Sequence, residues 1–109
     1  MTLAAIIPAD PAQPMTLEYL DGPGSFLRHL DALNPDAVTG EDFTAYVRPT
    51  RPSEPLPVNT RAEAFVNERI PSGHIGGPLT GTVVVLGPMD GEGGADVSEH
   101  ITTTLGLTP

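Results

Sequence analysis

The sequence predicts an α+β fold: a single compact domain in which a mixed or antiparallel sheet of about four strands is covered by two or three helices. Three observations support this class. The chain has 109 residues, which suits one continuous core rather than two. Short runs with the period of a strand alternate with stretches in which apolar residues recur at helical spacing. The connecting segments are rich in proline and glycine, which mark turns. We therefore expect residues 1–109 to form one domain.

The first two strands are predicted to form a hairpin. The apolar run TLAAII, residues 2–7, is too short for a helix and is ended by Pro8, so it is predicted to be a buried strand. In MTLEYL, residues 15–20, apolar and polar side chains alternate, which is typical of a half-buried strand. The segment PADPAQP between them favours a turn, so the two strands are expected to pair.

A helix, a third strand and a loop are expected next. In residues 25–34, SFLRHLDALN, apolar residues recur at helical spacing behind a serine suited to the N-cap, and Pro35 ends the run. Residues 43–47, FTAYV, alternate as a strand does. The proline-rich loop 48–58 follows, and its density of proline excludes a helix.

The second helix is predicted to begin behind Thr60 as N-cap. Glu63 stands three residues later, in the spacing at which the two side chains cap each other's backbone amides. The expected inward face is formed by Ala62, Phe65, Val66 and Ile70. Pro71 ends the helix, and Arg61 and Arg69 are expected on its exposed sides.

The last part of the chain is predicted to contain the central strand and a third helix. TVVVLG, residues 82–87, has four consecutive apolar residues, as in a strand that is buried on both faces. A Gly-rich acidic loop, residues 87–96, follows. Asp96 is predicted to cap the last helix, because Glu99 lies three residues on. The expected inward face of this helix consists of Val97, Ile101 and Leu105.

The charge of the chain is strongly negative. It has 14 acidic residues against five arginines, no lysine and a net charge of −9. This balance favours basic partners and argues against direct nucleic-acid binding, which requires clustered lysine and arginine. The acids are near their usual abundance and lysine is missing, so a GC-rich genome explains the composition equally well.

Several classes of protein are disfavoured by composition. The chain has no cysteine, which excludes disulfides, thiolate nucleophiles and cysteine-based zinc sites. It has no apolar run of the roughly 18 to 20 residues that a membrane span needs, so no membrane contact is expected. The first residues, MTLAAIIPADP, lack the basic region of a secretory signal. We therefore expect a cytoplasmic protein.

No catalytic, metal or cofactor motif is recognised. An EF-hand loop starting at Asp90 would need a glutamate where Ile101 stands. The Gly-rich stretch GHIGG matches neither common nucleotide-binding pattern, and the phosphate loop requires a lysine. The histidines His29, His74 and His100 are isolated from one another. We therefore expect no cofactor, no metal and no catalytic residue; enzymatic activity stays open, with a non-enzymatic role favoured.

The candidate ligand-binding residues are Asn59 and Arg61 at the predicted helix start, with His74 as a possible wall. Helix N-termini attract anions, so Arg61 beside free amides could hold a phosphate or a carboxylate. Against this, Glu63 is expected to satisfy part of the same helix end. The alternative is that this stretch only starts the helix.

Four short motifs follow one another along the chain: AIIPADP at the start, AYV before the proline loop, P-x-N-x-R-A over residues 57–62, and GTVVVLG near the end. In these motifs the chain resembles a small domain-of-unknown-function family that is common in bacteriophages and actinobacteria. The proline loop is longer than is usual in that family. The resemblance implies a compact α+β domain with no established activity, often phage-encoded and then located in the host cytoplasm. Its polar positions coincide with Asn59 and Arg61.

Three functions are weighed on this basis. The first is a non-enzymatic accessory protein that binds a host protein and modulates it. The second is a small-ligand binder or enzyme with its site around Asn59 and Arg61. The third is a DNA mimic, which requires carboxylates in a spaced row on one face.

Overall fold

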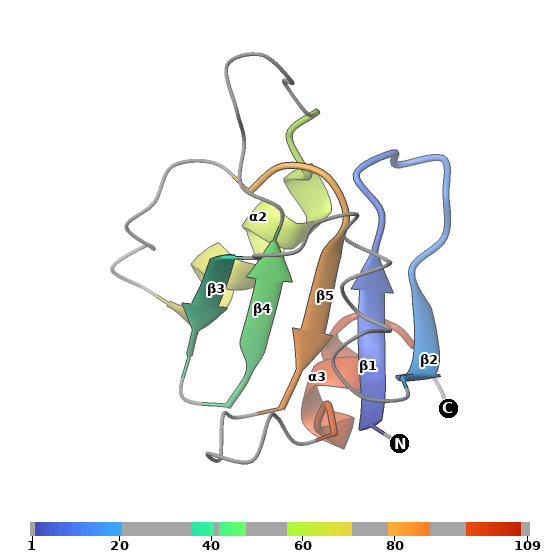
Figure 1. The fold of residues 1–109 in the computed structure, drawn as a ribbon, viewed down its shortest axis with the longest axis vertical. Helices are drawn as coiled ribbons and strands as arrows, with labels where there is room; N and C mark the ends of the chain where they lie inside the picture. Colours follow the sequence, from blue (N-terminus) through green and yellow to red (C-terminus); the bar gives the residue numbers. More distant parts are fainter. Residues whose placement is uncertain are drawn as a thin grey trace.

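A computed structural model describes residues 2–20, 36–40, 42–47, 57–70, 79–87 and 96–107. Within these ranges five strands form one antiparallel sheet, with two helices against it (Figure 1). The elements are β1 (Thr2–Ile7), β2 (Thr16–Leu20), β3 (Asp36–Thr39), β4 (Thr44–Val47), α2 (Thr60–Arg69), β5 (Val83–Leu86) and α3 (Glu99–Thr104). The Cα radius of gyration is 12.7 Å, close to the value of about 13 Å for a compact domain of this length. The predicted α+β class is confirmed.

The strand order is β2-β1-β5-β4-β3. β5 lies at the centre, and all four of its residues are buried, which confirms the prediction for residues 82–87. The predicted hairpin is also confirmed, because β1 and β2 pair antiparallel from Thr2↔Leu20 to Ile6↔Thr16. Every neighbouring pair in the sheet is antiparallel.

The prediction of about four strands is corrected by β3, which the sequence pattern did not reveal. This strand has four residues, DAVT, and pairs antiparallel with β4. It is too short to show alternation, and its pairing depends on the turn that follows. In that turn the Gly40 amide donates to the Phe43 carbonyl at 3.0 Å. A Cβ at Gly40 would lie 2.2 Å from the Phe43 ring, so the turn needs glycine.

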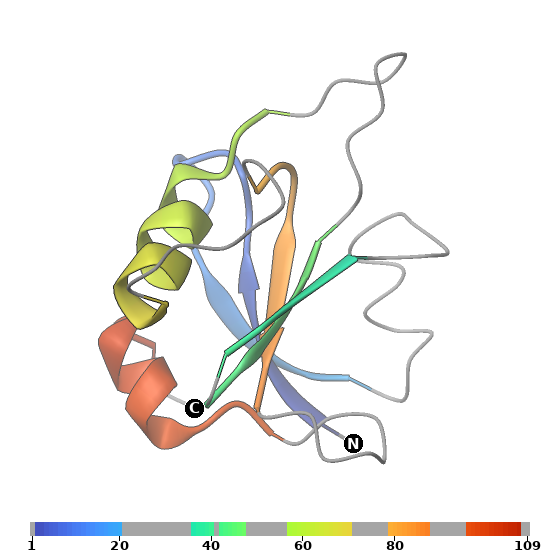
Figure 2. The same cartoon turned by 90° about the vertical axis from the view of Figure 1, so that its left-hand side faces the viewer.

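Both described helices cover the same face of the sheet (Figure 2). This helix face carries one continuous core of alternate strand residues and inward helix residues. The core is formed by Ala5, Ile7, Phe43, Ala45, Val47, Ala62, Phe65, Val66, Leu79, Val83, Val85, Val97 and Ile101. Phe43 and Phe65 meet edge to face, with ring centroids 5.2 Å apart. The inward residues predicted for the two helices are therefore confirmed, with Ile70 and Leu105 partly buried.

The second face of the sheet is buried as well. Its core consists of Ala4, Ile6, Leu20, Val84 and Leu86, with Tyr46 packed against it. Thr44 lies on this face, because it pairs with Leu86, and it is only 1% exposed. Its hydroxyl has no hydrogen-bond partner among the described residues. Burial of such a group without a partner destabilises the fold.

The segment before α3 is attached to the edge of β1. The Leu3 amide donates to Asp96 Oδ1 at 2.9 Å, and the Val97 amide donates to the Leu3 carbonyl at 2.9 Å. These bonds continue the pairing of β1 beyond its last partner in β5. The N-cap of α3 is Ser98, whose side chain accepts from the Ile101 amide. The prediction of Asp96 as the cap is therefore wrong, because its carboxylate binds β1 instead.

Some predictions fall on residues that are not described. The helix expected over 25–34 lies outside the described ranges, as do most of the proline-rich loop 48–58 and of the Gly-rich acidic loop 87–96. At the end of the proline loop, Val58 forms an isolated bridge with Thr80. Among the helices that are described, none is long and apolar enough to span a bilayer.

Candidate functional site

Asn59 lies at the centre of the candidate site and is fully buried. Its Nδ2 donates to the carbonyl of Ile7 at 2.8 Å and to that of Gly81 at 2.9 Å. Its Oδ1 accepts from the Ala62 amide at 3.1 Å, and its own amide donates to the Leu79 carbonyl at 2.8 Å. One side chain thus joins the end of β1, the segment leading into β5 and the first turn of α2.

These bonds correct the predicted start of the helix by one position. Asn59 is the N-cap of α2, and Thr60 is its first helical residue. Asparagine and threonine are both good N-caps, so spacing alone did not separate them. Asn59 is selected as N-cap because its side-chain Nδ2 also binds the carbonyls of Ile7 and Gly81. The sequence pattern does not reveal these carbonyls.

Glu63 also differs from its predicted role. One of its carboxylate oxygens accepts a short hydrogen bond from the Leu79 amide. In the predicted capping box this carboxylate would bind the amide of Thr60. The N-cap is Asn59 instead, and its backbone amide donates to the Leu79 carbonyl, so Asn59 and Glu63 together bind both backbone groups of Leu79.

Arg61 points from the first turn of α2 to the loop that follows β1. Its Nη2 donates to the Pro8 carbonyl at 2.7 Å and to the Asp10 carbonyl at 3.0 Å. Arg61 is half-buried, so the expectation of an exposed arginine is wrong. Through the carbonyls of Ile7, Pro8 and Asp10, Asn59 and Arg61 therefore hold one chain segment, residues 7–10, against the helix start.

The second arginine of the described ranges is also engaged within the fold. Arg69, whose side chain is 14% exposed, forms an ion pair with Asp42 at 2.7 Å. It donates to the Thr104 hydroxyl at 3.0 Å and lies over the Phe65 ring, 5.7 Å from its centroid. This arginine connects α2 with the β3–β4 turn and with α3, so the expectation of an exposed Arg69 is wrong as well.

The kind of ligand that the helix start could bind depends on the N–H groups of Arg61 that do not bind Pro8 or Asp10. A guanidinium has five N–H groups, and the two bonds to Pro8 and Asp10 both come from Nη2. Nε and Nη1 have no partner among the described residues, so an anion at the helix start would bind these groups without releasing the loop. The side-chain oxygen and nitrogen of Asn59 already bind the protein, so Asn59 would act by holding the site in shape.

The third candidate residue, His74, lies outside the described residues. Within the described ranges, no three histidine or acidic side chains are grouped so that they could hold a metal ion.

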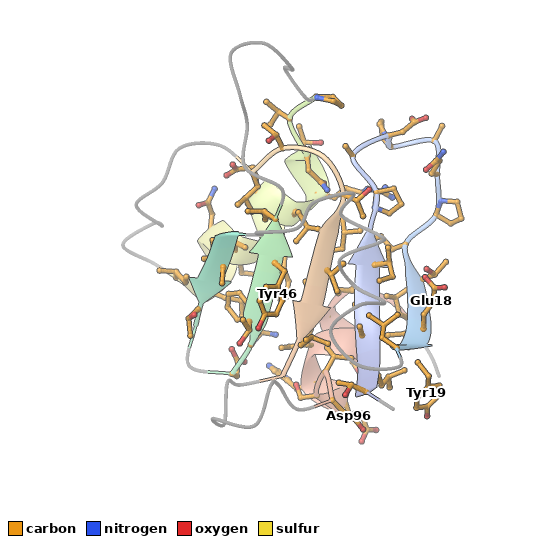
Figure 3. All side chains as sticks on the ribbon, viewed as in Figure 1. Glu18, Tyr19, Tyr46 and Asp96 are labelled. Atoms are coloured by element: carbon orange, nitrogen blue, oxygen red, sulfur yellow. The ribbon has the colours of Figure 1, made fainter. Side chains whose placement is uncertain are left out.

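Tyr19 is exposed, although alternation of apolar and polar side chains in residues 15–20 is typical of a half-buried strand. Tyr19 pairs with Leu3 on the helix face. However, β2 is a terminal strand, and the side chain of Tyr19 is 61% exposed. Figure 3 shows Glu18 and Tyr19 on β2 at the margin of the sheet. Strand order, which short motifs do not encode, decides this exposure.

No family model, no curated protein and no solved structure matches this chain. The resemblance in the sequence motifs therefore stays a prediction.

Proposed function

We propose that this protein is a non-enzymatic accessory protein, of phage or actinobacterial origin, that binds a host protein and modulates it. The observation that carries this proposal is the use of the polar helix start inside the fold. Asn59 is fully buried with every side-chain polar atom bonded, and Arg61 binds two backbone carbonyls. The residues that looked most like a ligand site thus have a structural role. The proposed origin rests on the family resemblance.

Charge indicates the kind of partner. The chain carries a net charge of −9, and both arginines of the described ranges are engaged in contacts within the chain. Their positive charge is partly withdrawn from the surface, while exposed carboxylates such as Glu68 and Glu99 face solvent. A surface of this sign attracts basic proteins and repels nucleic-acid phosphates.

The proposal is tested by cross-linking the tagged protein in an actinobacterial lysate at low salt and identifying the linked proteins. We expect one host protein to be enriched over a tag-only control, and the yield to fall as salt rises, because exposed charges are screened. Recovery of no enriched protein at any salt concentration would count against the proposal.

The alternative is a small-anion binder or enzyme at the helix start, supported by the Nε and Nη1 groups of Arg61, which have no partner among the described residues. Arg61→Ala separates the two functions. As a fold residue, Arg61 should contribute about 1 to 2 kcal/mol of unfolding free energy, because two charge-assisted hydrogen bonds are lost. The measurement is urea unfolding with and without inorganic phosphate. An unchanged unfolding free energy, together with phosphate stabilisation of the wild type alone, would favour the ligand site.

DNA mimicry is a second alternative and is less well supported. It requires carboxylates that stand free in a row, whereas several described carboxylates bind groups of their own chain. Asp42 binds Arg69, Glu63 binds the Leu79 amide and Asp96 binds the Leu3 amide.

A further inference from the structure

The outer edge of β2 directs backbone groups away from the sheet in a regular pattern. In an antiparallel pair, residues alternate between those that bond to the partner strand and those that face away from it. The amide and carbonyl of Leu3 bind Asp96 and Val97, on the side of β1 opposite to β2. The Leu3↔Tyr19 and Ala5↔Leu17 pairs are therefore the non-bonded ones. It follows that the backbone groups of Leu17 and Tyr19 point away from the sheet.

In the described ranges, this edge lacks most of the devices that protect a terminal strand. Natural sheets protect their edges with charged residues, above all lysine, with proline, bulges or very short strands, or by covering the edge with a helix or loop. β2 contains no proline, lysine or arginine, and its five residues pair one to one with β1 without a bulge. Within the described ranges, no strand pairs with β2 on its outer side. An edge of this kind is a template for an added strand.

The opposite edge of the sheet is a poorer template. β3 has only four residues, and the same alternation directs the backbone groups of Ala37 and Thr39 outward. Neither side chain offers a large apolar surface. On β2, by contrast, Tyr19 is the most exposed large hydrophobic side chain of the described residues, at 61%. Exposed tyrosine is typical of protein interfaces.

The side chains of β2 define the chemistry of the strand that would pair with it. Leu17 and Tyr19 lie on the helix face, and Glu18 lies on the opposite face. Neighbouring side chains on the same face interact across a sheet. An added strand would therefore place apolar side chains beside Leu17 and Tyr19. Its alternate side chains would lie on the opposite face, where the net charge of −9 favours basic residues.

We propose that the outer edge of β2 binds an extended segment of a basic partner protein, in which apolar and basic residues alternate, as an additional strand of the sheet. This inference rests on the proposed function and names its surface and partner class. A second copy of this chain is the less suitable occupant, because each copy carries a net charge of −9 and like charges oppose association.

The test is residue-resolved amide hydrogen exchange of the protein with a capped peptide in which valine and arginine alternate. At saturation, exchange should slow at least about tenfold at the amides of Leu17 and Tyr19, because they gain hydrogen bonds. The amide of Glu18 already faces β1 and should change little. Unchanged exchange at Leu17 and Tyr19, or slowing at Ala37 and Thr39 instead, would overturn the inference.

Two matched variants sharpen the test. Tyr19→Pro removes an outward N–H and leaves the bonds to β1 in place, and Thr39→Pro does the same at the β3 edge. We expect Tyr19→Pro to weaken peptide binding at least about fivefold, because roughly one net hydrogen bond is lost. Thr39→Pro should leave peptide binding unchanged. Should Tyr19→Pro not fold, Tyr19→Ala replaces it, and wild-type affinity in that variant contradicts the inference.

Two controls separate the remaining outcomes. Replacing arginine by glutamate in the peptide should abolish binding. Protection of Leu17 and Tyr19 that appears on concentrating the protein without peptide would identify a second copy as the occupant and overturn the choice of partner. Cross-linking with Tyr19→Pro separates this inference from the proposed function: a host protein captured equally by both forms contradicts only the β2 edge.

Discussion

Asn59 shows how much of the fold one buried amide can determine. An N-cap needs only an acceptor, and several residue types supply one. Asn59 also supplies two donors, to the carbonyls of Ile7 and Gly81. Residues 59–61 stood out in the sequence because polar residues stand there at a predicted helix start. It could not assign their roles, because the carbonyls that they bind belong to segments distant in the sequence.

Asn59→Asp tests whether those donors matter. The variant keeps the size of the side chain and the cap acceptor, and aspartate at an exposed N-cap would be neutral or favourable. Here its carboxylate would face two carbonyls in a buried position, so we expect a loss of about 3 kcal/mol in unfolding free energy. Asn67→Asp, on the exposed side of α2, is the control. Equal urea midpoints for the two variants would contradict the role of Asn59.

Thr44→Val is expected to raise the unfolding free energy, whereas Asn59→Asp is expected to lower it. The Thr44 hydroxyl is buried and has no partner among the described residues, and valine has nearly the same shape. Removal of a buried, unpaired hydroxyl should raise the unfolding free energy by about 1 kcal/mol. Thr39→Val, at the exposed residue opposite Thr44 in β3, should have little effect. A destabilised Thr44→Val protein would show that the hydroxyl is bonded.

At the scale of the elements, strong local patterns were sufficient and weak ones were not. β1 and β5 are uninterrupted apolar runs, and their positions followed from the sequence because such runs must be buried. β3 was missed because DAVT contains too few residues to show a period, and its pairing with β4 depends on the close contact between Gly40 and Phe43. The N-caps of α2 and α3 differ from the predicted ones because contacts with distant segments decide which of several neighbouring polar residues caps the helix.

The start of α3 can be tested with a pair of variants. Ser98→Ala removes the cap acceptor and should cost about 1 kcal/mol of stability, with faster amide exchange at Ile101. Asp96→Ala should instead speed exchange at Leu3, because the carboxylate binds that amide. Residue-resolved exchange of both variants checks the assignment. Faster exchange at Ile101 in Asp96→Ala alone would restore Asp96 as the cap.

At the scale of the whole molecule, the sheet has one face covered by α2 and α3 and a central strand buried on both sides. In the described ranges, no strand pairs with β2 on its outer side. The net charge of −9 was evident from composition. Composition could not show how the charge is distributed, because that depends on which arginines are used internally. Both arginines of the described ranges bind groups of their own chain. Arg61 binds the carbonyls of Pro8 and Asp10, and Arg69 binds the carboxylate of Asp42.

The central claim is that this protein acts by binding another protein and not by holding a small ligand at the helix start. Native mass spectrometry of the protein, isolated gently from an actinobacterial host, tests this claim most directly because it weighs the intact complex. We expect to measure the mass of the chain plus one protein partner. The complex should dissociate when the salt concentration of the sample is raised before it is transferred to the spectrometer. A chain that carries only a small retained anion, lost in Arg61→Ala, would contradict the claim.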